Sequence, residues 1–180
     1  MHRKPFIALL VATGLIAGGT VAGIAASRDD PSRQQVVAQR GARVMPFALD
    51  ATTHVFEATP KGGTQRVVAK EASDVGNISL IRSHLREEAD AFSRGDFADP
   101  SAIHGDDMPG LSALRAGYKD IDVRYRDLPD GAEIAYATDN SELAAAVRAW
   151  FGAQLRDHAD DATTSSQPAT DHTSHSEHAN

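Results

Sequence analysis

Histidine is the residue type with which this sequence is best equipped for chemistry. The chain of 180 residues contains eight histidines and no cysteine. Without thiolates, a transition metal would be bound by imidazole, carboxylate or thioether groups, and imidazole and carboxylate suit Zn, Cu and Ni. Seven histidines follow the N-terminal segment and are candidate metal ligands: His54, His84, His104, His158, His172, His175 and His178.

The C-terminal histidines stand in a polar segment. In "DHTSHSEH", His172, His175 and His178 recur at every third position. We predict that residues 158–180 form a disordered tail, because they are rich in Ser, Thr, Asp and His and carry too few apolar residues to bury. Such a segment would bind divalent ions weakly, since it must be ordered on binding. The alternative is a solvated tail that binds nothing.

The other three histidines fall in the part of the chain with hydrophobic periodicity. His54 shares one face of a predicted strand with Phe56 by the period-two rule. His84 lies within a predicted helix, four residues before Glu88 and on the same face. His104 lies in an aperiodic segment. These three regions belong to one small folding unit, so the three imidazoles could meet on one ion.

Three neutral imidazoles with one open position are typical of a zinc site. A thioether ligand from Met108, four residues after His104, or from Met45 would shift the preference toward copper, since thioether is a soft ligand. The alternative is that each histidine is satisfied separately, for example His84 by Glu88. No local metal motif such as H-E-x-x-H is present.

Motifs of covalent catalysis are missing from the sequence. There is no G-x-S-x-G elbow, no P-loop and no cysteine nucleophile. The adjacent acids Glu87–Glu88 and Asp106–Asp107 are expected to point apart and to be solvated. We therefore assign no catalytic residue.

The N-terminus has the pattern of an export segment. Arg3 and Lys4 precede an uncharged run over residues 6–26. Residues 1–27 are predicted to be a signal peptide or an N-terminal membrane anchor. Either places the following chain outside the cytoplasm, because the positive end stays inside. A formal net charge of -7 argues against a nucleic-acid partner.

An internal repeat predicts the fold. Residues 54–92 and 122–160 each read as strand, Pro-x-Gly turn, strand and helix. After a polar linker over 28–43, we predict one α+β domain over 44–157. Its two β-β-α repeats would form a four-stranded antiparallel sheet with two helices packed on one face.

The repeat leads to two further expectations. "DPSAIHGDDMPGL", residues 99–111, is predicted as a loop that joins the two copies. Aligning "IRSHL" with "VRAWF" puts His84 at the position of Trp150. We therefore expect His84 to be at least half buried.

Three stretches of the domain resemble a known family: "ATTHVFEATPKGGTQ", "LIRSHLREEADAFSRGDFADPSAIHGDDMPGLSALRAG" and "VRYRDLPDGAEIAYAT...AWFGAQLRDH". The family comprises short exported bacterial proteins that often carry the name aspartate carbamoyltransferase, and the resemblance covers about residues 44–158. The resemblance implies that "THVF", "RSHL" and "IHG", which contain His54, His84 and His104, are characteristic motifs of the family. The name implies a transferase, although the chain has no Ser-Thr-Arg-Thr tetrapeptide and no His-Pro pair.

Three functional hypotheses follow. The first is an exported, membrane-tethered domain that binds Cu or Zn through histidines, with a role in metal handling or sensing. The second is a metal-free extracytoplasmic interaction module that docks an unidentified protein on the open face of the sheet. A contiguous apolar patch there would favour it, and outward-pointing Asp122, Arg124, Lys70 and Arg66 would weaken it. The third is the transferase of the family name.

Overall fold

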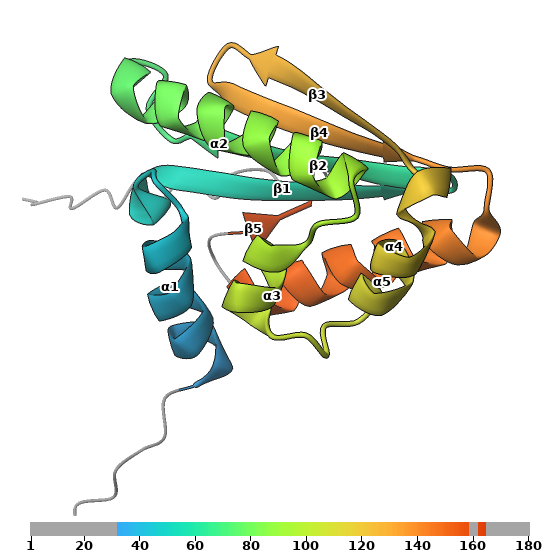
Figure 1. The fold of residues 1–180 in the computed structure, drawn as a ribbon. Helices are drawn as coiled ribbons and strands as arrows, with labels where there is room; N and C mark the ends of the chain where they lie inside the picture. The colour runs from blue at the N-terminus through green and yellow to red at the C-terminus, as the bar shows by residue number, and fades with distance from the viewer. Residues whose placement is uncertain (1–31, 159–161, 165–180) are drawn as a thin grey trace, which may run out of the picture. The chain divides into compact units, whose positions relative to one another are not determined.

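The structure is a computed structural model of residues 1–180, and it describes residues 32–158 and 162–164 (Figure 1). Two short 3-10 turns, Leu49–Ala51 and Tyr118–Asp120, accompany the helices and strands. In chain order these are α1 (Arg33–Val44), β1 (Thr52–Thr59), β2 (Gly62–Ala69), α2 (Val75–Ser93), α3 (Ala98–His104), α4 (Leu111–Gly117), β3 (Asp122–Leu128), β4 (Gly131–Ala137), α5 (Ser141–His158) and β5 (Ala162–Thr163).

The five strands form one mixed sheet in the order β3-β4-β2-β1-β5. β1 to β4 pair antiparallel, as predicted. The prediction of a four-stranded, wholly antiparallel sheet was wrong at one edge, where β5 pairs with β1 in parallel. A strand of two residues is held by backbone hydrogen bonds and has no side-chain periodicity to reveal it. The α+β class itself is confirmed.

The two β-β-α units are present as β1-β2-α2 and β3-β4-α5. Each hairpin turns over two residues, and its second strand begins on a glycine, Gly62 or Gly131. Because β2 and β4 pair with each other, each glycine faces the backbone of the other hairpin. A Cβ at Gly131 would lie 2.0 Å from the Val67 carbonyl oxygen, and one at Gly62 would lie 2.1 Å from that of Tyr136. The repeat therefore requires glycine at both positions.

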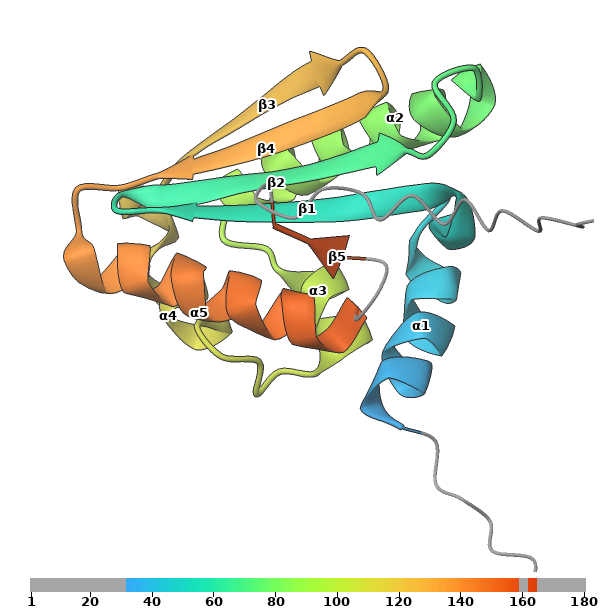
Figure 2. The ribbon, with the colours of Figure 1, turned by 180° about the vertical axis from the view of Figure 1, so that it is seen from behind.

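The core lies between the sheet and the helices α2 and α5. Trp150 of α5 is fully buried and meets Phe92 of α2, Phe97 and Tyr136 of β4 in edge-to-face contacts, with ring centroids 5.6–5.9 Å apart. Since Tyr136 contacts residues of both helices, α2 and α5 cover the same face of the sheet (Figures 1 and 2). Three further helices complete this side, because α1 packs on α3 and α5, and α4 packs on α5.

Two stretches predicted to lack regular structure are helical. The predicted linker forms α1, which begins with a capping box between Ser32 and Gln35 and buries Val37 and Gly41. Only a narrow stripe of α1 is apolar, so its polar composition hid the helix. The predicted loop over 99–111 contains most of α3, which is seven residues long and too short to show helical periodicity.

The chain ends also differ from the prediction. α5 continues to His158, and Ala162–Thr163 forms β5, so the part of the predicted tail that the structure describes is ordered. None of the helices in residues 32–158 is long and apolar enough to cross a membrane. The predicted export segment and His172, His175 and His178 lie outside the described residues.

Candidate metal centre

Three histidines from three elements meet beneath the end of the sheet. His54 is on β1, His104 is the last residue of α3, and His158 is the last residue of α5. The His158 ring stacks on that of His54 with centroids 5.1 Å apart, and it meets the His104 ring edge-on at 5.0 Å. His158 therefore lies between two imidazoles that are fifty residues apart in the sequence.

These rings line a closed-in space of about 30 Å³, which we call the histidine cavity. It is about the size of one water molecule. Its other lining residues are Met45, Phe56, Gln65, Glu88, Phe92, Pro100, Ile103, Trp150 and Gln154.

Polar atoms without partners belong to residues that line the histidine cavity. Among the described residues, no hydrogen-bond partner exists for His54 Nδ1, Gln154 Oε1 or Trp150 Nε1, and all three atoms are buried. Buried polar atoms are almost always hydrogen bonded, so unpaired ones call for an explanation. Three residues that line the histidine cavity therefore each carry a buried polar atom without a partner among the described residues.

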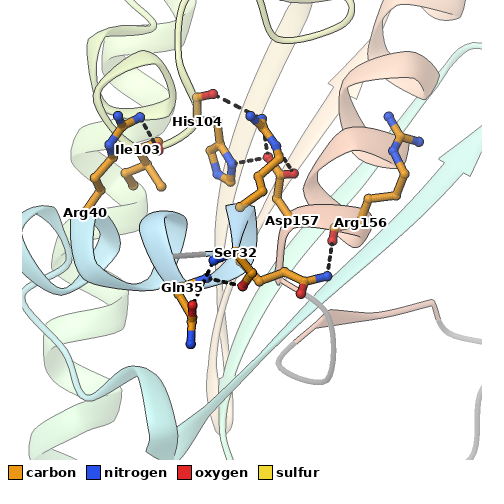
Figure 3. Close-up of polar contacts among 9 residues, drawn as sticks. Ser32, Gln35, Arg40, Ile103, His104, Arg156 and Asp157 are labelled. Carbon is orange, nitrogen blue, oxygen red and sulfur yellow. Dashed lines mark hydrogen bonds and ion pairs between the residues drawn. The ribbon is translucent and has the colours of Figure 1, made fainter. Parts of the chain in front are cut away.

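Asp157 fixes the His104 ring. His104 Nδ1 lies 2.8 Å from Asp157 Oδ2, and both side chains are buried (Figure 3). Arg33 of α1 donates to both oxygens of Asp157 at 2.6 and 2.7 Å and to the His104 carbonyl at 3.1 Å. With Nδ1–H donating to a carboxylate, the His104 lone pair is on Nε2. Metal-binding histidines usually donate their other ring N–H to a carboxylate in this way, which fixes the orientation of the ring.

The imidazoles are neutral at physiological pH. Burial, followed by the charges of His158, His104 and His84, lowers the pKa of His54 to about 3. Burial and the charge of His104 lower the pKa of His158 to about 4. Burial also lowers the pKa of His104, although Asp157 opposes this shift. Neutral imidazole is the form that coordinates a metal, so binding here would not have to displace a proton.

A larger and mainly apolar pocket adjoins the histidine cavity. This entrance pocket has a volume of about 320 Å³ and lies between α1 and the ends of α3 and α5. It shares Met45, His54, Ile103 and His158 with the histidine cavity. The entrance pocket therefore provides a path from solvent to the imidazoles, with the Met45 thioether beside it.

His84 belongs to a second cluster, with Glu88 and Asp99. The candidate ligand atoms of these three residues all lie within 4.8 Å of one another. The Phe47 ring packs between His84 and His54, with centroids 5.7 and 6.2 Å from them. Burial, and then the charge of Asp99, raise the pKa of Glu88 to about 8. Glu88 is half-buried and lines the histidine cavity, unlike its exposed neighbour Glu87.

The structure thus brings together two of the three domain histidines that we grouped. His54 and His104 meet His158, which we assigned to the tail, while His84 is buried as expected but stands apart. Met108 lies in the apolar core and outside the lining of both pockets.

Asp157 and Asp99 were missed as partners of the histidines, whereas Glu88 was placed beside His84 from the helical spacing alone. One signal was available, since Trp150, Gln154 and His158 follow at intervals of four and share a helix face. Extending the second helix to His158 would have placed its ring beside the core. The contact between Glu88 and Asp99 has no such local signal, because it joins two helices.

Replacing Glu88 by glutamine is expected to stabilise the metal-free protein most at alkaline pH. The folded protein keeps the Glu88 proton up to a pKa of about 8, whereas the ordinary pKa of a glutamate, which applies in the unfolded chain, is 4.5. The stability linked to this raised pKa is fully present below the pKa of Glu88 in the unfolded chain. It is lost as the pH rises through the pKa of Glu88 in the folded protein. Glutamine is neutral throughout, so E88Q should gain on the order of a few kcal/mol above that window.

Urea unfolding in the presence of a chelator, at several pH values across that window, measures this difference. His54 and His158 titrate in both proteins, so their contributions cancel in the comparison. A free-energy difference between E88Q and wild type that does not change with pH would contradict the neutral state of Glu88.

The open face of the sheet is charged. Figure 2 shows β2, β4 and β3 with no helix in front of them. Ion pairs cross this face: Arg66–Glu57 at 3.5 Å, Arg126–Glu133 at 2.7 Å and Arg124–Asp122 at 2.5 Å. This is the pattern that we expected to weaken the hypothesis of an apolar docking surface.

No protein-family model, curated protein sequence or solved structure matches the chain. The resemblance to the family named aspartate carbamoyltransferase therefore stays a prediction.

Proposed function

We propose that this chain is an exported, membrane-tethered domain that binds a transition metal through His54, His104 and His158. The observation that carries the proposal is the convergence of three neutral imidazoles on one small cavity. One of them, His54, has a buried Nδ1 with no hydrogen-bond partner among the described residues. The carboxylate behind His104 adds the orientation that a metal ligand needs. The extracytoplasmic, membrane-linked location rests on the N-terminal segment over residues 1–27.

Copper fits this ligand set best. Met45 lines both the histidine cavity and the entrance pocket, so a soft thioether stands beside three imidazoles. Thioether and imidazole together favour copper, whereas three imidazoles alone suit zinc. A partly exposed site that is reached through a pocket is suited to taking up and releasing an ion. We therefore assign the domain to metal handling or sensing, with Zn as the competing ion.

A titration with copper tests the proposal. The full-length chain in detergent carries His172→Ala, His175→Ala and His178→Ala, which removes the tail as a competing ligand; we call it the tail-substituted chain. Competition with a coloured Cu(I) chelator should give one bound ion with a Kd below about 1 μM. Failure to compete for copper at that level would overturn the folded site and leave the tail as the only histidine cluster.

Replacing Met45 by leucine should change the selectivity of the site. M45L removes the thioether at nearly constant volume, so the affinity for Cu(I) is expected to fall by about tenfold and that for Zn(II) to stay the same. Met108→Leu is the matched control, because Met108 is buried in the core away from the cavity. If M45L and M108L bind Cu(I) equally well, the thioether is not a ligand.

A further inference from the structure

We propose that His84, Glu88 and Asp99 form a second cation site, which binds a divalent ion of the zinc–manganese class beside the histidine cavity. The site goes beyond the copper site proposed above and does not depend on it. We call it the carboxylate site.

Two helices bring the ligands of the carboxylate site together. His84 and Glu88 are four residues apart on α2, which places them one turn apart on the same face. Asp99 comes from the first turn of α3, the next helix along the chain. A pair of ligands on one helix and a third from a neighbouring helix is a rigid frame, because helices hold side chains more precisely than loops do.

The spacing of the ligand atoms fits an ion between them. One nitrogen of His84 and one oxygen each of Glu88 and Asp99 lie within 4.8 Å of one another. Ligands of a tetrahedral zinc ion, bonded at about 2.0–2.2 Å, stand roughly 3.3–3.6 Å apart. Small side-chain rotations would therefore complete the coordination.

The burial of His84 is the second observation. His84 is only 7 % exposed in the folded chain. A buried imidazole normally has a partner for its nitrogens. Here one His84 nitrogen lies within 4.8 Å of an oxygen of each carboxylate, so an ion bound by both acids would give that nitrogen a partner.

The chemistry of the ligands selects the ion. Two carboxylates and one imidazole are harder than three imidazoles and a thioether, so they favour zinc or manganese over Cu(I). Two close carboxylates repel each other unless a proton or a cation lies between them. A dication would neutralise both. Because Glu88 also lines the histidine cavity, the two sites share a wall.

Manganese separates the two sites experimentally. The tail-substituted chain is first loaded with one equivalent of Cu(I) and then titrated with Mn²⁺, while the EPR signal of free Mn²⁺ is recorded. We expect one bound Mn²⁺ that Zn²⁺ displaces. E88Q and D99N should each weaken Mn²⁺ binding by at least about tenfold.

Glu87→Gln is the matched control, because Glu87 is exposed on the same helix. E87Q should bind Mn²⁺ like the parent chain, and a far-UV circular dichroism spectrum like that of the parent shows that E88Q is folded. If the parent, E87Q and E88Q bind Mn²⁺ equally, or if none binds it, the carboxylate site is wrong. The Mn²⁺ titration is then repeated without copper, which separates the two proposals. If the chain fails to bind copper but still binds Mn²⁺, the copper site is wrong and the carboxylate site stands.

Discussion

Replacing His158 by alanine in the tail-substituted chain is expected to lower the affinity for Cu(I) by about a hundredfold, or about 2.7 kcal/mol. His158 is the central ring of the three, in contact with His54 on one side and His104 on the other. Its loss removes one ligand and also the group that spans the other two. The remaining imidazoles would be left without a third donor, because the His84 ring stands behind Phe47.

The variant should remain folded. His158 is partly exposed at the last position of α5, so alanine there removes little core packing. Arg156→Ala is the control at the same helix end, because Arg156 is exposed and its side chain is not in the cavity lining. Chelator competition on both variants gives the affinities. If H158A retains the affinity of R156A, the imidazole site is not where we place it.

Replacing Trp150 by alanine is expected to destabilise the domain by about 3–5 kcal/mol, which is the usual cost of truncating a buried tryptophan. The Trp150 ring is fully buried and contacts four other rings, from Phe92, Phe97, Tyr136 and Phe151. It joins both halves of the repeat, since Phe92 belongs to the first unit and Tyr136 to the second. Alanine would leave a cavity at the centre of the core.

Trp150→Phe is the matched variant. The indole Nε1 has no partner among the described residues, so phenylalanine sacrifices no hydrogen bond there. The cost of W150F should therefore come from lost volume alone and stay below about 2 kcal/mol. Urea unfolding of the metal-free proteins measures both values. A cost for W150A no larger than that for W150F would show that Trp150 is not central to the core.

The elements that the repeat predicted are those specified by local patterns. "IDVRYR" alternates with period two, and Val123 and Tyr125 indeed pack against the core. The helix of the first repeat, α2, ends near Gly95, whose φ of 80° suits a residue without a Cβ. The helix of the second repeat, α5, begins at Ser141. The side chain of the preceding residue, Asn140, accepts hydrogen bonds from the amides of Glu142 and Leu143. Such signals act within a few residues, so the sequence reveals them.

The missed features depend on contacts between distant segments. α1 is ordered by packing on α3 and α5 and by the ion pair from Arg33 to Asp157, which are 124 residues apart. β5 exists because β1 offers a free edge. Neither contact leaves a period or a motif in the residues that make it.

The histidines show which features follow from the residues themselves and which depend on tertiary packing. Their number, the lack of cysteine and the face that His54 occupies on its strand follow from the residue types and from the period of the strand. The choice of His158 over His84 as the third imidazole follows from the packing that brings the ends of α5 and α3 together beside β1. That packing depends on burial of the core around Trp150, which no short stretch of the chain encodes alone. Residue chemistry therefore indicated a metal, while the packing of helices determined which side chains could share it.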